Sequence, residues 1–419
     1  MSRANIEDWD VENEEYWENK GKKIAYRNLW ISIFCLLLAF AIWLMWSIII
    51  VQMQDLEFPF SKAQLYTLPA IAGLAGATFR IPNSFLIAIG GGRNVIFLTT
   101  ALLLIPAIGV GIALQDKDTP YLTFALLAAF SGIGGGNFAS SMSNISYFFP
   151  KRVQGTSLGL NAGLGNVGVS IMQVLLPFTM GYAIFGTLGG DGFELPKDVG
   201  DEAAGTIKYI QNCGLTWVPF LIVFAFASFF GMNNLSTATP KMPSTIAGLG
   251  KSFYLLMLGL ITSFLGAYLL VGRDWNMWLV LPLVIILTVL IMRYLSLGDI
   301  KDDLKKQFSI FDSKHCWFMT IIYTMTFGSF IGYSAAFPKL IQDVFGTLPD
   351  GTTNPNAPSP YAYAWLGPLV GSLLRPVGGW LSDKVNSGAK VTHWTTITMI
   401  LAALGVAYFV VQADASSKP

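Results

Sequence analysis

Long apolar runs recur along this 419-residue chain, and no other feature restricts its fold as strongly. A helix needs roughly 20 apolar residues to cross about 30 Å of hydrocarbon. Lipid offers the backbone no hydrogen-bond partners, so spans built from such runs must be helices. The sequence therefore predicts an all-α polytopic membrane protein with eleven spans. These cover residues 28–52, 64–89, 94–114, 120–149, 154–185, 213–233, 252–271, 276–297, 317–340, 360–382 and 391–412.

Composition excludes several classes of protein. Charged residues make up only 12% of the chain, whereas soluble domains carry about 25%, so we expect the lipid bilayer and not water to surround it. The formal net charge of +1 predicts no nucleic-acid partner. Cys35, Cys213 and Cys316 form no Cys-x-x-Cys pair, so neither a disulfide framework nor a zinc site is indicated.

The chain carries no motif typical of an enzyme. We find no nucleophile with an adjacent base, no cluster of metal ligands and no phosphate-binding loop, so neither catalysis nor a cofactor is expected. Residues 163–168 match Gly-x-Gly-x-x-Gly, the pattern of dinucleotide-binding sites. That fingerprint must follow a strand, and these residues lie inside a long apolar span.

Lysine and arginine are unevenly distributed between the loops, which predicts the orientation of the chain. With the N-terminus in the cytoplasm, seventeen of the 26 basic residues lie inside, seven lie outside and two lie within spans. Residues 1–27 carry mixed charges and lack the apolar core of a secretory signal. We therefore predict that 1–27 is a cytoplasmic N-terminal segment.

The two arginines within spans, Arg80 and Arg375, lie at similar depth. Arg80 precedes the turn at 90–92 by ten residues and Arg375 precedes Asp383 by eight, which gives about 15 and 12 Å of helix. Each follows a glycine by four residues and is followed closely by a proline, which indicates repeated halves. Transporters built from repeats bind substrate at the midplane between the repeats.

Neither arginine has an acidic partner in the predicted spans, which contain no Asp or Glu. A charge at this depth costs at least about 2.5–3.5 kcal/mol on insertion scales, so something must offset it. Guanidinium groups present planar donor forks that suit oxyanions, so we interpret the missing counter-charge as a small anionic substrate. The alternative is that each arginine snorkels or bonds backbone carbonyls. The lack of membrane acids favours anion exchange over proton symport.

The fifth span combines close-packing glycines with a polar stripe. Gly155, Gly159 and Gly163 recur every four residues, a spacing that lets membrane helices approach closely. Asn166 continues that face and is the predicted anion-facing amide, although it could merely bond a neighbouring helix. In the ninth span, Tyr323 and Phe327 share a face with Phe330 and Ser334, and such rings could cover a flat anion or simply pack.

Six stretches carry a specific resemblance. They are RNLWISIFCLLLAF (27–40), FRIPNSF (79–85), NFASSMSNISYFFPK (137–151), GLNAGLGNVGVSIMQ (159–173), TFGSFIGYSAAF (326–337) and GPLVGSLLRPVGGWLSD (367–383). With these stretches the chain resembles the nitrate/nitrite porter family of the major facilitator superfamily. The resemblance implies a bacterial inner-membrane protein that exchanges nitrate for nitrite by alternating access, and we expect a monomer.

The resemblance also implies roles for individual residues. Its anion-binding arginines match Arg80 and Arg375, and its aromatic clamp matches Phe138 and Tyr323. The substrate-binding residues expected from the spans and the resemblance together are Arg80, Arg375, Asn166, Phe138, Tyr323, Phe40, Phe327, Gly163 and Gly165.

The chain departs from the family pattern in two ways, and both affect its predicted domains. Two additional apolar spans lie between the halves, and we expect them to pack at the periphery. The family continues through three more helices, so we expect a fragment of a longer reading frame. The predicted units are the N-terminal segment 1–27, a six-helix bundle at 28–235, a central insert at 236–316 and the first three helices of a second bundle at 317–419.

Three other functions remain open from the sequence. The first is nitrate/proton symport. The second is transport of an organic anion or drug, since extra central helices also occur in drug exporters, whose wide sites tend to contain membrane carboxylates. The third is a membrane protein that does not transport, such as a sensor or scaffold, although midplane charges are costly without a function.

Overall fold

The computed structural model of the chain describes residues 4–199, 202–346, 348, 352, 354 and 356–412. The helices are α1 (Glu14–Tyr16), α2 (Lys22–Leu44), α3 (Trp46–Asp55), α4 (Lys62–Gly90), α5 (Gly92–Leu102), α6 (Leu104–Ala113), α7 (Tyr121–Ser146), α8 (Gln154–Thr179), α9 (Asn212–Leu215), α10 (Val218–Gly231), α11 (Thr245–Gly272), α12 (Met277–Leu295), α13 (Gly298–Gln307), α14 (Lys314–Phe345), α15 (Pro360–Tyr363), α16 (Leu366–Lys384) and α17 (Gly388–Gln412). The strands are β1 (Asn5–Ile6), β2 (Phe193–Glu194), β3 (Ile207–Lys208) and β4 (Asn234–Leu235). Short π or 3-10 turns cover Trp17–Gly21, Lys151–Val153, Gly186–Leu188 and Phe308–Asp312.

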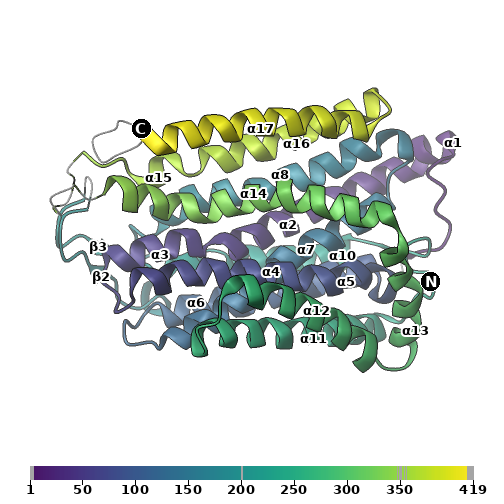
Figure 1. Ribbon diagram of the computed structural model, residues 1–419. Coiled ribbons are helices and arrows are strands. Elements are labelled where there is room, and N and C mark those ends of the chain that lie inside the picture. The colour runs from purple at the N-terminus through teal and green to yellow at the C-terminus, as the bar shows by residue number, and fades with distance from the viewer. Residues whose placement is uncertain are drawn as a thin grey trace.

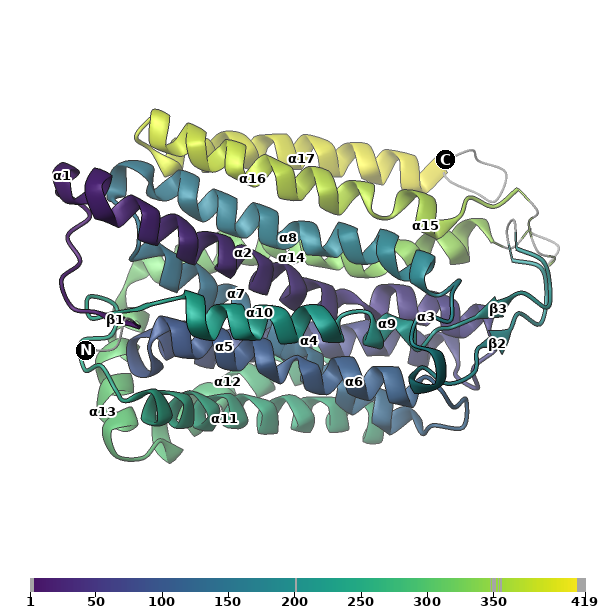
Figure 2. The ribbon, with the colours of Figure 1, turned by 180° about the vertical axis from the view of Figure 1, so that it is seen from behind.

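The long helices run roughly alongside one another, and the strands are confined to the connections (Figure 1). In both views, α16 and α17 lie along one edge of the bundle, and α11 and α12 lie along the opposite edge (Figure 2). The connections α3–α4 and α8–α9 emerge at one end, which we call the outer end because the sequence predicts that it faces outside. The opposite end carries α1 and α13 and is called the inner end.

Every predicted span corresponds to helix, and four are interrupted by one or two non-helical residues. In the part of the chain that the structure describes, nine helical segments are long and apolar enough to cross a membrane, by length and composition. Helices α14 and α16 are not among these nine. Helix α14 interleaves Ser, Thr, Gly and Tyr with its apolar residues, and α16 interleaves Ser, Gly and Arg, which lowers the mean hydropathy of both helices. The all-α polytopic fold class is therefore confirmed.

The predicted span 154–185 is too long, because α8 ends at Thr179. The side-chain amide of Asn212 donates hydrogen bonds to the carbonyls of Thr179 and Tyr182, both at 2.8 Å. These carbonyls lack helical partners, so the amide stabilises a turn in place of further helix. The loop 186–212 contains a small antiparallel ladder of β2 and β3. The limits of the four predicted domains stay predictions, and residues 413–419 lie outside the described ranges.

Helix α4 carries Arg80 and begins at a capping box. The hydroxyl of Ser61 accepts from the Gln64 N–H at 3.2 Å, and the Gln64 side chain accepts from the Ser61 N–H at 2.9 Å. These reciprocal bonds satisfy two amide groups that a helix start leaves unpaired. Pro82 lies within the helix, where its ring removes a backbone donor. The side chains of Asn83 and Ser84 donate to the carbonyls of Phe79 and Arg80, one turn earlier on the same helix.

Glycines on α8 bring α16 unusually close. A Cβ atom at Gly163 would lie 2.5 Å from Pro376 Cδ and 2.7 Å from the Ser372 carbonyl oxygen, and one at Gly159 would lie 2.7 Å from the Arg375 carbonyl oxygen. At the inner end of this α8–α16 contact, the Asp383 carboxylate on α16 accepts from the N–H groups of Gly155 and Thr156 at 2.8 and 2.6 Å. A carboxylate at a helix N-terminus complements its partial positive charge. Helix α16 is thereby fixed along α8.

The central insert packs directly behind the Arg80 helix. A Cβ atom at Gly248 of α11 would lie 2.4 Å from the Gly90 carbonyl oxygen, and one at Gly259 would lie 3.1 Å from Pro82 Cγ. Helix α12 contacts α11 through the hydrogen bond between the hydroxyls of Thr288 and Thr262 at 2.8 Å. The two helices lie at the edge of the bundle (Figures 1 and 2), but α11 is closely packed against α4.

The N-terminal segment folds back over the inner end. Strand β1 pairs in parallel with β4, with Asn5 opposite Asn234. The indole N–H of Trp9 donates to the carbonyl of Tyr147 at 3.0 Å, and the Trp17 ring packs 5.7 Å from that of Phe149. The segment thus joins the turn between α7 and α8 to the residues that follow α10.

The contact between α8 and α16 predicts the effect of a single methyl group at Gly163. We expect Gly163→Ala to lower thermal stability, because a Cβ there overlaps backbone and ring atoms, and overpacking costs about 1–3 kcal/mol. Gly328→Ala on α14 is the matched control, since a Cβ there meets no atom within 4 Å. Differential scanning fluorimetry in detergent measures both, and equal melting temperatures would contradict this packing.

Candidate functional site

Arg80 and Arg375 reach one site from helices on opposite sides of it. Arg80 lies ten residues before the end of α4, and Arg375 lies nine residues before the end of α16. Helix α8 lies against α16, and α7 lies against α4, so both arginines project from closely packed helix pairs. The prediction that they lie at similar depth agrees with these positions.

Both guanidinium groups lie over the ring of Phe327 on α14. The Cζ atoms of Arg80 and Arg375 are 4.3 and 5.1 Å from its centroid, so the two cations cannot be farther apart than the sum of these distances. At roughly 9 Å and an effective dielectric constant of about 20, two like charges repel by about 2 kcal/mol. The structure therefore brings the two arginines together, as the repeat pattern predicts.

The polar partners of the two arginines are neutral. Nη1 of Arg80 donates to the Tyr323 hydroxyl at 3.0 Å, and Nη2 is buried without a partner among the described residues. The Asn166 amide lies against Arg375. With its oxygen turned toward the guanidinium, it accepts from Nε at 3.2 Å and from Nη1 and Nη2 at 3.3 Å, whereas the opposite orientation would place donors against donors.

No carboxylate of the described residues lies within 4.0 Å of either guanidinium group. The carboxylates on neighbouring helices have other partners. Asp383 bonds the N-terminus of α8, Asp343 bonds Lys339 and Tyr66, and Asp55 bonds Gln342. Both positive charges therefore remain uncompensated by the described part of the chain.

Aromatic rings surround the guanidinium groups. The Phe138 centroid is 5.1 Å from Arg80 Cζ and 5.9 Å from Arg375 Cζ. The rings of Phe138 and Tyr323 face each other at 6.1 Å with an interplanar angle of 30°. A planar anion in contact with two rings needs about 7 Å between them, so a clamp of these two rings must open slightly. Phe40 is fully buried and contacts Phe138 and Phe327 at 6.0 and 6.1 Å, which places it behind the rings.

One turn before each arginine, a glycine makes room for another aromatic ring. A Cβ atom at Gly76 would lie 2.3 Å from the ring of Trp43, which is itself 5.9 Å from Arg80 Cζ. A Cβ atom at Gly371 would lie 3.2 Å from the ring of Phe330, which is 5.5 Å from Arg375 Cζ. The glycine four residues before each arginine thus has the same role in both halves, because it leaves room for an aromatic ring beside the guanidinium group. Trp43 was not expected from the sequence, and the Gly76 spacing was its only signal.

The two predicted glycines lie at helix contacts. Gly163 faces Pro376 and Ser372 on α16, and a Cβ atom at Gly165 would lie 2.7 Å from the Leu36 side chain on α2. Their direct contact with substrate stays a prediction. They lie on the same part of α8 as Asn166, whose amide lies against Arg375. The site as a whole presents two half-buried cations, one buried free N–H group and a phenol, with aromatic rings on several sides. It is suited to bind a small planar anion.

Comparison with known proteins agrees with this geometry. The sequence profile of the Major Facilitator Superfamily matches residues 10–173. The chain is 38% identical over 405 residues to the probable nitrate/nitrite antiporter NarK2 of Thermus thermophilus, covering 96% of this chain and 74% of that protein. It is 35% identical over 400 residues to the nitrate/nitrite transporter NarU of Escherichia coli (strain K12), covering 96% and 69%. Both relatives carry the names of transporters, the first as a probable antiporter. The chain therefore belongs to the nitrate/nitrite porter family of the major facilitator superfamily.

Proposed function

We propose that this chain transports nitrate and nitrite across the bacterial inner membrane, and that Arg80 and Arg375 bind the anion between them. The observation that carries the proposal is the pair of guanidinium groups over one ring, with neutral partners and with no carboxylate of the described residues within 4.0 Å. The names of relatives at 35–38% identity support the substrate. We expect the chain to act as a monomer with its N-terminus in the cytoplasm.

The chemistry of the site fits an oxyanion such as nitrate. Its three oxygens lie in one plane, so a planar guanidinium fork can donate to two of them at once. Nη2 of Arg80 is a buried donor without a partner, and an anion oxygen would satisfy it. Binding would also relieve the repulsion between the two arginines. The free energy for binding therefore comes from groups that are unsatisfied in the empty site.

Antiport is the favoured mechanism. Proton-coupled carriers commonly relay protons through carboxylates or histidines within the membrane. The nearest groups to both arginines are rings, a phenol and an amide. An empty site with two repelling cations would resist the conformational change unless an anion is bound. This coupling gives exchange of one anion for another without a proton.

The arginine assignment predicts a loss of exchange when the planar fork is removed. We expect Arg80→Lys and Arg375→Lys each to slow nitrate/nitrite counterflow in proteoliposomes by at least about tenfold, since one hydrogen bond to a charged group contributes about 1.5–3 kcal/mol. Lysine keeps the charge and loses the bidentate geometry.

Arg273→Lys is the matched control for these variants. Arg273 also donates to a tyrosine hydroxyl, that of Tyr268 at 3.1 Å, but it is exposed at the end of α11. Its replacement should leave counterflow unchanged. Unimpaired exchange by either site variant would remove the arginines from the mechanism. Inhibition by bulky organic anions but not by nitrate would assign the site to a different substrate.

A carboxylate at position 166 should act as an internal competitor of the anion. We expect Asn166→Asp to form an ion pair with Arg375, because the amide oxygen lies about 3.2 Å from its Nε. Nitrate would then no longer raise the melting temperature of the purified protein. Asn276→Asp, at the exposed N-cap of α12, should keep the nitrate-induced shift. A normal shift for Asn166→Asp would show that this amide does not face the bound anion.

Antiport also predicts independence from a proton gradient. Nitrate uptake into nitrite-loaded proteoliposomes should proceed at the same rate with and without an imposed pH difference, and it should stop when no internal anion is present. The measurement is uptake of isotope-labelled nitrate over time. Uptake into anion-free vesicles that follows the pH difference would instead establish proton symport.

A further inference from the structure

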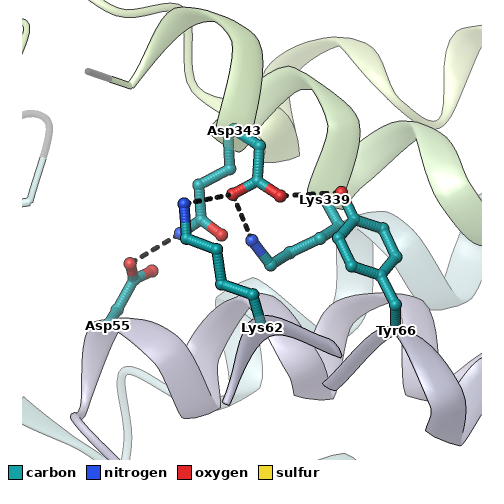
Figure 3. Close-up of polar contacts among 6 residues, drawn as sticks. Asp55, Lys62, Tyr66, Lys339 and Asp343 are labelled. Atoms are coloured by element: carbon teal, nitrogen blue, oxygen red, sulfur yellow. Dashed lines mark hydrogen bonds and ion pairs between the residues drawn. The ribbon is translucent and has the colours of Figure 1, made fainter. Parts of the chain in front are cut away.

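A second charged cluster lies far from the arginine site, near the outer end. Asp343, close to the end of α14, accepts from the Tyr66 hydroxyl at 2.7 Å and lies 3.6 Å from the ammonium of Lys62. Its carboxylate also bonds Lys339, one turn earlier on α14. Figure 3 shows Lys62 and Tyr66 projecting from α4 toward Asp343. One carboxylate thus gathers three donors from two helices.

Two further contacts cross the same boundary. The Gln342 amide donates to an Asp55 carboxylate oxygen at 2.7 Å, which joins α14 to α3. The hydroxyl of Tyr361 on α15 lies 3.5 Å from the side-chain oxygen of Gln52 on α3. Gln52 is only 3% exposed, so this end of the boundary is closed to solvent. All the contacts join helices of the N-terminal half to helices that follow the insert.

These contacts hold α14 against the N-terminal helices between the outer end and the arginines. Arg80 on α4 faces Tyr323 and Phe327 on α14, so the boundary between α4 and α14 leads from this end directly to Arg80. Asp343 follows Phe327 by sixteen residues on α14, which is about 24 Å of helix. At the inner end, Asp383 bonds α8 in a separate contact. The arginine site therefore lies between two polar closures.

The distribution of charges makes the outer closure easy to break. Lys339 is fully buried, but it lies on the same helix as Asp343 and stays paired when α14 moves. The side chains of Lys62 and Asp343 are 66% and 19% exposed, and exposed ion pairs contribute little to stability. Separation of the outer ends of α14 and α4 would thus break the Tyr66 hydrogen bond, the weak Lys62 ion pair and the Gln342–Asp55 bond to α3, without stranding a buried lysine.

We propose that Asp343 is the latch of a gate between α4 and α14, and that Lys62 and Tyr66 are the donors it releases when the gate opens toward the outer end. The inference rests on the proposed transport function, because a gate needs an anion to admit. Lys62 and Tyr66 would then be the first donors that an incoming oxyanion meets. Asp343 acts as a positioning residue and does not touch the substrate at the arginines.

The first test measures opening without measuring transport. A single reporter, Gln52→Cys, is placed in a background in which Cys35, Cys213 and Cys316 are all replaced by serine. Its reaction with a water-soluble maleimide is followed in nanodiscs, where both membrane faces are accessible. We expect Asp343→Asn to speed labelling about tenfold, which corresponds to about 1.4 kcal/mol. Asp303→Asn, which removes the Lys241 ion pair at 3.3 Å elsewhere, should leave the rate unchanged.

Thr100→Cys is a second reporter that separates opening from unfolding. Thr100 is fully buried within the N-terminal helices, away from the α4–α14 boundary. The latch is supported if Asp343→Asn speeds labelling at position 52 and not at position 100. It is overturned if neither rate changes, or if both rates rise together.

The second test locks the gate. In the pair Lys62→Cys and Asp343→Cys, a short bis-maleimide should abolish nitrate/nitrite counterflow relative to the same protein before cross-linking. The control pair Lys241→Cys and Asp303→Cys should transport equally before and after. Unchanged counterflow in the cross-linked 62–343 protein overturns the gate. If the unmodified chain shows no counterflow at all, the transport proposal fails, while the labelling rates still decide whether Asp343 closes this boundary.

Discussion

The guanidinium groups of Arg80 and Arg375 lie in an apolar helix bundle with no carboxylate of the described residues beside them, and the packing around them depends on how these two charges are accommodated. Each guanidinium is covered by ring faces and receives one neutral acceptor, the Tyr323 hydroxyl for Arg80 and the Asn166 amide for Arg375. Cation–π contacts of this kind contribute about 0.5–2 kcal/mol each. They make the burial of the arginines tolerable without cancelling their charge. A carboxylate would stabilise the fold further and would occupy the place where we propose that the anion binds.

The small residues of the bundle serve this arrangement. Gly163 and Gly159 let α16 approach α8 until Arg375 reaches Asn166, and Gly76 lets Trp43 lie beside Arg80. The prolines that follow the arginines also lie at glycine contacts. Pro376 packs against Gly163 of α8, and Pro82 packs against Gly259 of the insert. Membrane helices gain little from apolar contact with one another, so close packing at glycine contributes most to their association. The positions of the residues in the site therefore depend on glycines, which have no side chain, as much as on the side chains that line the site.

The sequence predicted the helices and the pairing of the arginines because both follow from counting residues. Spans are defined by the length of apolar runs, and depth follows from the rise per residue. Partners could not be predicted in the same way. Gly163 and Gly165 lie against Pro376 and Leu36, and these neighbours could not be predicted because spacing does not say which helix lies opposite; their contact with substrate stays a prediction. The contact of Tyr66 with Asp343 joins residues 277 positions apart, and no local pattern indicates it.

The pairing of β1 with β4 bears on how the chain is made. The bond between Asn234 and Asn5 joins positions 229 residues apart, so the first strand waits without a partner while six helical segments are synthesised and inserted. Once residues 234 and 235 leave the ribosome, this short ladder can close over the inner end. Chains fold largely in the order of their synthesis. We therefore expect the ladder to complete the first half before Arg375 on α16 is translated, so that the later helices pack onto a surface already formed.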